Sequence, residues 1–309
     1  MKASKISLVR APNPSAMTLS GTNSYLIDCG QSLAACIDPG PANAGHVDRL
    51  VAHAAQLGLR IDTILLTHGH PDHAPAAAML RQKTGATVAA HARSQTEHQR
   101  SLGDNDTVRI AQTDFLVVDA PGHTFEHLVF YETAERALFT GDVVLGEGTV
   151  VIAPPGGAMR PYQATLQRLA EQFPDARRIY GGHGEAVDDP AAKLQYYIEH
   201  RRIRENELLA ALATGPQTIP ELVTQIYAAV DSILWPAAAR QMLAYLLALE
   251  DEGHVRSAAL SRPPTAQEHA ILNPQWETIV GPEDARVIEA ELGALLRLDT
   301  IRVFELASP

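Results

Sequence analysis

The residues most able to do chemistry in this chain are three histidines and an aspartate in one short segment. His68, His70, Asp72 and His73 follow directly after the apolar run 61–66. Imidazole nitrogens and carboxylate oxygens are ligands that a borderline-soft ion such as zinc binds. At the end of a strand, the first two histidines can project to one side, and the proline after them presents Asp72 and His73 at a second position. The segment therefore offers ligands for two adjacent metal ions; the alternative is a histidine-rich turn that binds nothing.

Three further residues that can bind a metal follow later predicted strands in the same pattern. Each comes after a short apolar run and beside a glycine, which allows a sharp backbone turn. His123 stands in Pro-Gly-His, Asp142 in Thr-Gly-Asp and His183 in Gly-Gly-His. One such tripeptide indicates nothing alone, but the repetition in one chain predicts a composite metal site.

In this order the residues resemble the metallo-β-lactamase superfamily, whose pattern is His-x-His-x-Asp-His followed by His, Asp and His. The resemblance implies two zinc ions, although iron or manganese can replace zinc with the same donors. The implied ligands are His68, His70 and His123 for one ion, Asp72, His73 and His183 for the other, and Asp142 as the bridge. A bridging aspartate disfavours β-lactam hydrolysis, because true β-lactamases of this fold generally lack it.

A closer resemblance, to the β-lactamase-like protein 2 family, extends from about residue 10 to about residue 257. It rests on the segments 13–25, 37–41, 140–149 and 197–205. Members append a small winged-helix-like domain to the metal-binding fold. One characterised branch cuts single-stranded RNA, and related fungal enzymes release polyketides from carrier-protein thioesters. The motifs are specific for the family and not for the substrate.

The apolar patterns predict two strand-rich halves, each closed by helices, which indicates an α+β fold with an αββα sandwich and the metals at one rim. Strands are predicted at 6–10, 24–29, 33–37, 61–66, 87–90, 114–118, 127–131, 137–140 and 301–306. Helices are predicted at 43–57, 74–83, 93–100, 162–172, 190–212, 219–228, 237–249 and 284–298. The predicted parts are a catalytic domain (1–189), a long helix with a winged-helix-like domain (190–257) and an extension of unassigned role (258–309).

Composition and charge restrict the class of protein. A hydrophobic content of 46% with 20% charged residues is typical of a globular chain, and no run approaches the roughly 18 apolar residues of a membrane span. The first residues carry no apolar signal segment, so we expect a cytoplasmic protein without membrane contact. Cys29 and Cys36 are therefore predicted to be reduced core residues, although their spacing alone allows a disulfide.

The formal charge of −11 weighs against nucleic-acid binding, because affinity for phosphates draws on Lys and Arg. The winged-helix segment 218–256 carries two arginines against five acidic residues, a formal charge of −3. We therefore expect this module to be structural or to form a homodimer contact. A basic groove in an acidic chain keeps RNA open as an alternative partner.

The predicted chemistry is hydrolysis by a hydroxide that bridges the two metals, because zinc lowers the pKa of bound water towards neutrality. Asp72 is predicted to bind metal and to orient this hydroxide. Asp38 is interpreted as fixing the tautomer of a ligand histidine; the alternative is an ordinary turn carboxylate. His127 either supports the metal site or is a hydrogen-bonded core histidine.

Three residues are predicted to contact substrate. His200 lies in the long predicted helix at a position that the family resemblance places near the pocket mouth, where it can stabilise a developing oxyanion; the alternative is a surface histidine on a charged face. Asn23 and Tyr25 can line the pocket, although Asn23 also suits a tight turn.

The leading hypothesis is a binuclear zinc hydrolase that acts on a small ester, thioester or lactone. The runner-up keeps the same metal centre and cleaves single-stranded RNA. A third, non-enzymatic hypothesis is a winged-helix protein that binds nucleic acid, with the sandwich as a sensor.

Overall fold

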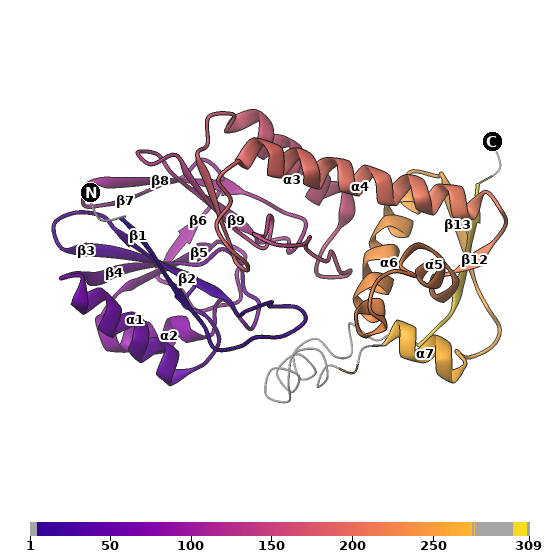
Figure 1. The fold of residues 1–309 in the computed structure, drawn as a ribbon, viewed down its shortest axis with the longest axis horizontal. Helices are drawn as coiled ribbons and strands as arrows, with labels where there is room; N and C mark the ends of the chain where they lie inside the picture. The colour runs from indigo at the N-terminus through magenta and orange to yellow at the C-terminus, as the bar shows by residue number, and fades with distance from the viewer. Residues whose placement is uncertain (1–4, 274, 276–298, 308–309) are drawn as a thin grey trace.

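Three β-sheets organise the chain, and two of them face each other in a sandwich (Figure 1). The computed structural model describes residues 5–273, 275 and 299–307. The sandwich fills the N-terminal part of the molecule, and the long helix α4 (Pro190–Leu212) connects it to a smaller, mainly helical domain. The predicted α+β class and αββα sandwich are confirmed.

The first sheet has six strands in chain order, from β1 to β6. They are β1 (Ile6–Arg10), β2 (Asn23–Asp28), β3 (Leu33–Ile37), β4 (Arg60–Leu65), β5 (Thr87–His91) and β6 (Arg100–Leu102). The first three pair antiparallel, and the strands from β3 to β6 pair parallel. Parallel neighbours need a crossover connection, and two of these crossovers are the helices α1 (Ala44–Gln56) and α2 (Ala76–Thr84).

The second sheet has the order β11-β10-β9-β8-β7. Its strands are β7 (Thr107–Ile110), β8 (Thr113–Asp119), β9 (Leu128–Glu132), β10 (Ala137–Gly141) and β11 (Arg178–Gly181). All pairs are antiparallel except β10 with β11, whose parallel pairing follows from the crossover helix α3 (Met159–Gln172).

The core lies in three apolar layers. Between the sheets pack alternate residues of both, including Ile37, Phe115 and Phe139. Leu50 of α1 packs in the layer outside the first sheet, and Leu166 of α3 in the layer outside the second. Alternation along each strand places these side chains on opposite faces, which is what the predicted sandwich requires.

The strand directions bring the candidate ligands to one rim. In the first sheet, β3 and β4 are parallel. In the second sheet, β9 is antiparallel to both β8 and β10, so β8 runs in the same direction as β10 and its parallel neighbour β11. The segments that follow these strands therefore leave their sheets at a common end. Each of them carries one or more of the predicted metal ligands or Asp38.

The C-terminal domain contains a three-stranded sheet with helices packed on it. Its elements after α4 are β12 (Gln217–Thr218), α5 (Ile219–Ile226), the 3₁₀-helix η1 (Ser232–Leu234), α6 (Trp235–Asp251), β13 (Val255–Ala259), α7 (Ala266–Leu272) and β14 (Arg302–Leu306). Thr218 and Glu221 form a capping box that starts α5. β14 is the central strand of the sheet, between β12 and β13. The predicted boundary at residue 257 therefore falls within β13 and separates β14 from the C-terminal domain, whose sheet β14 completes.

Two predicted helices have other outcomes. The helix predicted at 93–100 is wrong: turns lead instead into β6. Here His91 Nδ1 accepts the backbone N–H of Arg93, and Ser94 Oγ accepts that of Thr96, so local side chains compete for donors that a helix would need. The helix predicted at 284–298 lies outside the described residues. The last predicted strand is confirmed as β14.

The stretch Ser232–Asp251 is long and apolar enough to cross a membrane by length and composition, with a mean hydropathy of 1.2. In the 18-residue apolar window of this stretch, 61% of the residues are buried inside the protein. A buried core helix has the same apolar character, and Met242 and Leu246 at the centre of α6 are fully buried.

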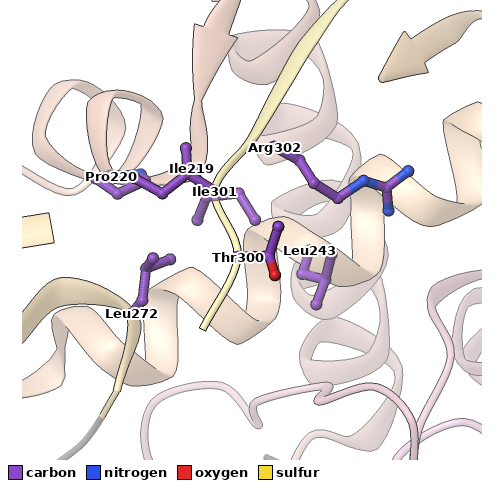
Figure 2. Close-up of a pocket in the computed structure, with 7 residues that line it drawn as sticks. All are labelled: Ile219, Pro220, Leu243, Leu272, Thr300, Ile301 and Arg302. Atoms are coloured by element: carbon purple, nitrogen blue, oxygen red, sulfur yellow. The ribbon is translucent and has the colours of Figure 1, made fainter. Parts of the chain in front are cut away.

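A small cavity lies where α5, α6 and α7 meet the start of β14 (Figure 2). Its volume is about 30 Å³, and it is lined by Ile219, Pro220, Leu243, Leu272, Thr300, Ile301 and Arg302. A space of this size holds a water molecule or two and is too small for a substrate.

Candidate metal centre

The seven predicted ligands come together at the rim of the sandwich in two groups. His68, His70, His123 and Asp142 offer ligand atoms that all lie within 4.8 Å of one another. A second group with the same spacing contains Asp72, His73 and His183. Apart from Asp142, which the resemblance implies as the bridge, these are the two sets that the resemblance implies for separate ions.

Asp142 lies between the two groups. Its Oδ1 is 3.4 Å from Nε2 of His73, and its Oδ2 is 3.5 Å from Nε2 of His183 and 3.7 Å from Nε2 of His123. On the far side, Oδ2 of Asp72 is 3.3 Å from Nε2 of both His73 and His183. Both carboxylates therefore face imidazole nitrogens, and Asp142 reaches both groups.

Several of these ligand atoms are buried and make no hydrogen bond. They show whether the residues fit a metal ion. Nε2 of His68, Nε2 of His73 and Oδ1 of Asp142 have no hydrogen-bond partner. Buried polar atoms are normally satisfied, because an unsatisfied one costs about 1–3 kcal/mol. Unsatisfied nitrogen and oxygen atoms that converge on one place are the donor set of a borderline-soft divalent ion. The residues fit such an ion at each group.

Neighbouring acceptors fix the tautomers of the ligand histidines. Oδ2 of Asp38 is 2.8 Å from Nδ1 of His73 and accepts the Thr67 hydroxyl at 2.6 Å, while Oδ1 accepts the Thr67 backbone N–H. Because the carboxylate only accepts, Nδ1 of His73 must carry the proton, and its Nε2 keeps a lone pair for the site. Asp38 therefore acts on a ligand histidine and is more than a turn residue.

The same logic holds for two other ligands. Nδ1 of His123 donates to the carbonyl of Val151 at 3.0 Å, and Nδ1 of His183 donates to that of Gly21 at 3.4 Å. A carbonyl can only accept, so Nδ1 of each ring carries a proton and Nε2 is the atom that faces the site. Nε2 of His183 faces both carboxylates, and Nε2 of His123 lies 3.0 Å from Nδ1 of His70 and 3.7 Å from Asp142. Sequence reasoning missed these backbone acceptors, since a carbonyl has no residue signature. Thr67, beside the histidine motif, is a missed partner that the sequence could have indicated.

His127 lies directly behind the site. Its Nε2 accepts the backbone N–H of Asp142 at 3.2 Å, and its ring stacks on that of His68 with 4.6 Å between centroids. A β-carbon at Gly141 (φ +46°) would come within 2.4 Å of the Thr67 hydroxyl, so only glycine allows the turn that delivers Asp142. His127 and Gly141 together set the position of this carboxylate.

The electrostatics divide the ligands into two kinds. Burial opposes ionisation of Asp72 and Asp142, but the nearby His73 and His183 outweigh it and hold the pKa of both carboxyls well below the usual range. Burial is the largest single effect on His183 and lowers its pKa, but Asp142 and Asp72 together outweigh it and raise the pKa to about 10. Burial, followed by His70, lowers the pKa of His123 to about 3. The two carboxylates thus favour positive charge beside His73 and His183, where a divalent ion would take the place of the proton on Nε2, and the first group supplies neutral imidazole donors.

Asn23 and Tyr25 lie beneath the loop that carries His183. The Asn23 amide donates to the carbonyls of Gly181 (3.0 Å) and Gly184 (2.8 Å), and the Tyr25 hydroxyl donates to that of Gly181 (2.8 Å). They are only 1% and 4% exposed. This placement favours a role in supporting the loop. The predicted contact of either residue with substrate stays a prediction.

His200 is half-buried on α4, with its ring 5.9 Å from that of Tyr196. Burial, together with Arg201 and Arg204, lowers its pKa to about 4. Among the described residues, no hydrogen bond or ring contact joins it to the seven ligands. Its predicted role towards substrate stays a prediction.

The chain matches the family model described as the metallo-β-lactamase superfamily over residues 17–183. Residues 218–261 match the β-lactamase-associated winged helix domain. The chain therefore belongs to the metallo-β-lactamase superfamily and is a hydrolase of that superfamily with an appended winged-helix domain.

Relatives agree with this assignment over most of the chain. It is 34% identical over 265 residues to the β-lactamase-like protein 2 homolog of Drosophila melanogaster, covering 79% of this chain and 87% of that protein. It is 30% identical over 230 residues to an atrochrysone carboxyl ACP thioesterase of Aspergillus fumigatus, covering 70% and 71%. A solved metallo-β-lactamase family protein from Thermus thermophilus has a TM-score of 0.69 at 25% identity, covering 82% of this chain and 96% of that one.

Proposed function

We propose that the protein is a binuclear zinc-dependent hydrolase of small esters, thioesters or lactones. The observation that carries the proposal is the convergence of ligand atoms from seven buried or half-buried residues. Asp38, Val151 and Gly21 already set the tautomers of three of them, His73, His123 and His183. Two divalent ions held there would polarise a carbonyl and ionise a water near neutral pH. The small-molecule substrate, the cytoplasmic location and the absence of membrane contact remain predictions.

The residues themselves supply positioning. Asp72 accepts the Thr22 hydroxyl at 2.8 Å, so its carboxylate is held while its other contacts face His73 and His183. This supports the predicted role of Asp72 in binding metal and orienting the attacking water. Cys29 and Cys36 are free and buried; burial raises the pKa of Cys29 to about 11 and that of Cys36 still further. Neither thiol suits a competing role as nucleophile.

The substrate class rests on charge and on one relative. The formal charge of −11 disfavours a polyanionic substrate, and a relative at 30% identity is named as an acyl-carrier-protein thioesterase. In the winged-helix domain, Arg256, Arg262 and Arg302 each lie within about 3 Å of a glutamate. Pairing with carboxylates leaves less positive charge for phosphates, which supports a structural role for the module, with a homodimer contact as a further prediction.

The test is a hydrolysis panel on full-length protein after elemental analysis of its bound metal. Purified protein loaded with zinc is assayed on acyl thioesters, small esters, lactones, phosphodiesters and labelled single-stranded RNA at physiological salt. We expect thioester or ester turnover that falls at least about a thousandfold in His68→Ala, because one ligand of the first group is lost. His254→Ala, at a histidine whose side chain is 65% exposed, is the matched control and should retain full activity.

Metal-dependent RNA cleavage that disappears in His68→Ala, without turnover of any acyl substrate, would replace the proposal with the ribonuclease alternative. Protein that binds no divalent ion would refute both. Nucleic-acid binding that persists after removal of the metal, without hydrolysis, would support the non-enzymatic alternative.

A further inference from the structure

The backbone segment 150–152 lies between a candidate metal ligand and the C-terminal domain. Val151 accepts the Nδ1–H of His123 through its carbonyl, at 3.0 Å. On either side of it, the carbonyl of Val150 and the N–H of Ile152 bond to side chains of α4 and α6. Three consecutive residues are therefore held, Val151 by the metal centre, Val150 by the connecting helix α4 and Ile152 by the C-terminal domain.

Two buried side chains make these interdomain bonds. Gln241 of α6 accepts the N–H of Ile152 at 3.0 Å through its Oε1, and the same oxygen accepts Nη1 of Arg201 at 3.1 Å. Nη2 of Arg201, on α4, donates to the Val150 carbonyl at 2.6 Å. Hydrogen bonds from a charged donor in a buried setting are among the strong ones. The pair therefore restrains the segment from both its carbonyl and its N–H side.

The surroundings leave this network little freedom. Arg201 is 2% exposed and Gln241 is 5% exposed. The Arg201 guanidinium lies over the ring of Tyr162, 5.0 Å from its centroid, and the Tyr245 hydroxyl donates to the Arg201 carbonyl at 3.1 Å. Both side chains are almost completely shielded from solvent, so water has little access to the bonds that they make to residues 150–152.

We propose that Gln241 and Arg201 are positioning residues for the metal centre, acting through the carbonyl of Val151 on the orientation and tautomer of His123. The proposal rests on the proposed function, because it assumes that His123 binds metal. A neutral imidazole exists as two tautomers, and only a fixed acceptor at Nδ1 keeps the Nε2 lone pair directed at the ion. The winged-helix domain thereby becomes part of the metal site without supplying a ligand.

The magnitude follows from what neighbours of metal ligands contribute in general. Loss of a partner that bonds a ligand directly typically costs 10–100-fold in metal affinity. Gln241 acts one step further away, so we expect about a tenfold loss on its removal. The effect should fall on the group that contains His68, His70 and His123, and spare the group that contains His73 and His183.

The experiment measures metal affinity and the opening of the segment, so it does not depend on a substrate. Gln241→Leu removes the shared acceptor, Gln241→Asn shortens it and serves if the first variant fails to fold, and Gln241→Glu keeps an acceptor of the same reach. Thr218→Ala, which loses the cap of α5, is the matched control for general destabilisation of the C-terminal domain. Zinc affinity is measured by competition with a chromophoric chelator, and hydrogen exchange is measured over residues 146–158.

We expect Gln241→Leu or Gln241→Asn to bind one of two zinc ions about tenfold more weakly, with faster exchange at Ile152. Gln241→Glu should restore both, and Thr218→Ala should change neither. Wild-type affinity in the Leu and Asn variants would overturn the inference even if exchange became faster. Equal losses in Thr218→Ala would overturn it as well, because they would show a general structural effect. Wild-type protein that binds no zinc would instead refute the proposed function, and this inference with it.

Discussion

Two buried polar clusters, one at the rim of the sandwich and one around Arg201, differ in how their hydrogen bonds are satisfied. At the rim, atoms of His68, His73 and Asp142 converge without partners. Around Arg201, two guanidinium nitrogens donate to a carbonyl and to Gln241 and an aromatic ring covers the cation, while Nε of Arg201 and Nε2 of Gln241 have no partner. Unsatisfied imidazole and carboxylate atoms that share one focus can bind a metal ion, whereas guanidinium and amide nitrogens are hydrogen-bond donors that bind no metal and indicate scaffold. The comparison separates a chemical site from its support although both are buried and polar.

The largest effect that would test this division comes from the core of the C-terminal domain. Leu222 on α5 is fully buried, and Leu222→Ala should lower the free energy of unfolding by about 2–5 kcal/mol through lost contacts and a cavity. Urea denaturation measures this loss. Zinc content of the folded variant should remain that of the wild type. Loss of zinc under conditions where the variant is fully folded would show that this core, too, belongs to the site.

An intermediate effect is expected at Asp38, which belongs to the rim but is no predicted ligand. Asp38→Asn keeps the size of the side chain, but the amide can present an N–H to Nδ1 of His73 and so favour the wrong tautomer. We expect a 10–100-fold loss of zinc affinity, measured by chelator competition. Asp48→Asn, at a carboxylate paired with Lys83 on the surface, is the control. Unchanged affinity in Asp38→Asn would mean that the tautomer is set without this carboxylate.

The smallest effect concerns an exception to the comparison. Arg240 on α6 is 3% exposed, and none of its three guanidinium nitrogens has a hydrogen-bond partner. Burial lowers its pKa to about 10. An unpaired buried charge is unfavourable, so Arg240→Met should stabilise the protein by about 1 kcal/mol, visible as a higher Tm. A lower Tm would show that Arg240 makes a stabilising interaction and would contradict this prediction.

The ligand set could be predicted because side-chain type, glycine and strand end occur together at each position. His123, Asp142 and His183 are far apart in sequence, yet each follows a strand whose direction leads to the same rim. The sandwich could be predicted for the same reason, since apolar alternation reports which faces are covered.

What could not be predicted depends on backbone groups and on distant pairing. The carbonyls of Val151 and Gly21 act as acceptors whatever their side chains, so no pattern marks them. The position of β14 between β12 and β13 joins residues 302–306 to strands about 50 and 85 positions earlier, and local patterns carry no information on such a partner. Asn23 is predicted to line the pocket because the sequence shows that its side chain is polar but does not show that it is buried.

The long helix α4 has a consequence beyond connection. One apolar cluster runs without a break from Val129 of the second sheet, past Leu166 and Leu194, to Met242 and Phe304 of the C-terminal domain. The appended module is therefore no detachable accessory. A fragment that ended before α4 would expose an apolar surface of the sandwich to water, and such patches promote aggregation. We therefore expect the two halves to fold and unfold as one cooperative unit.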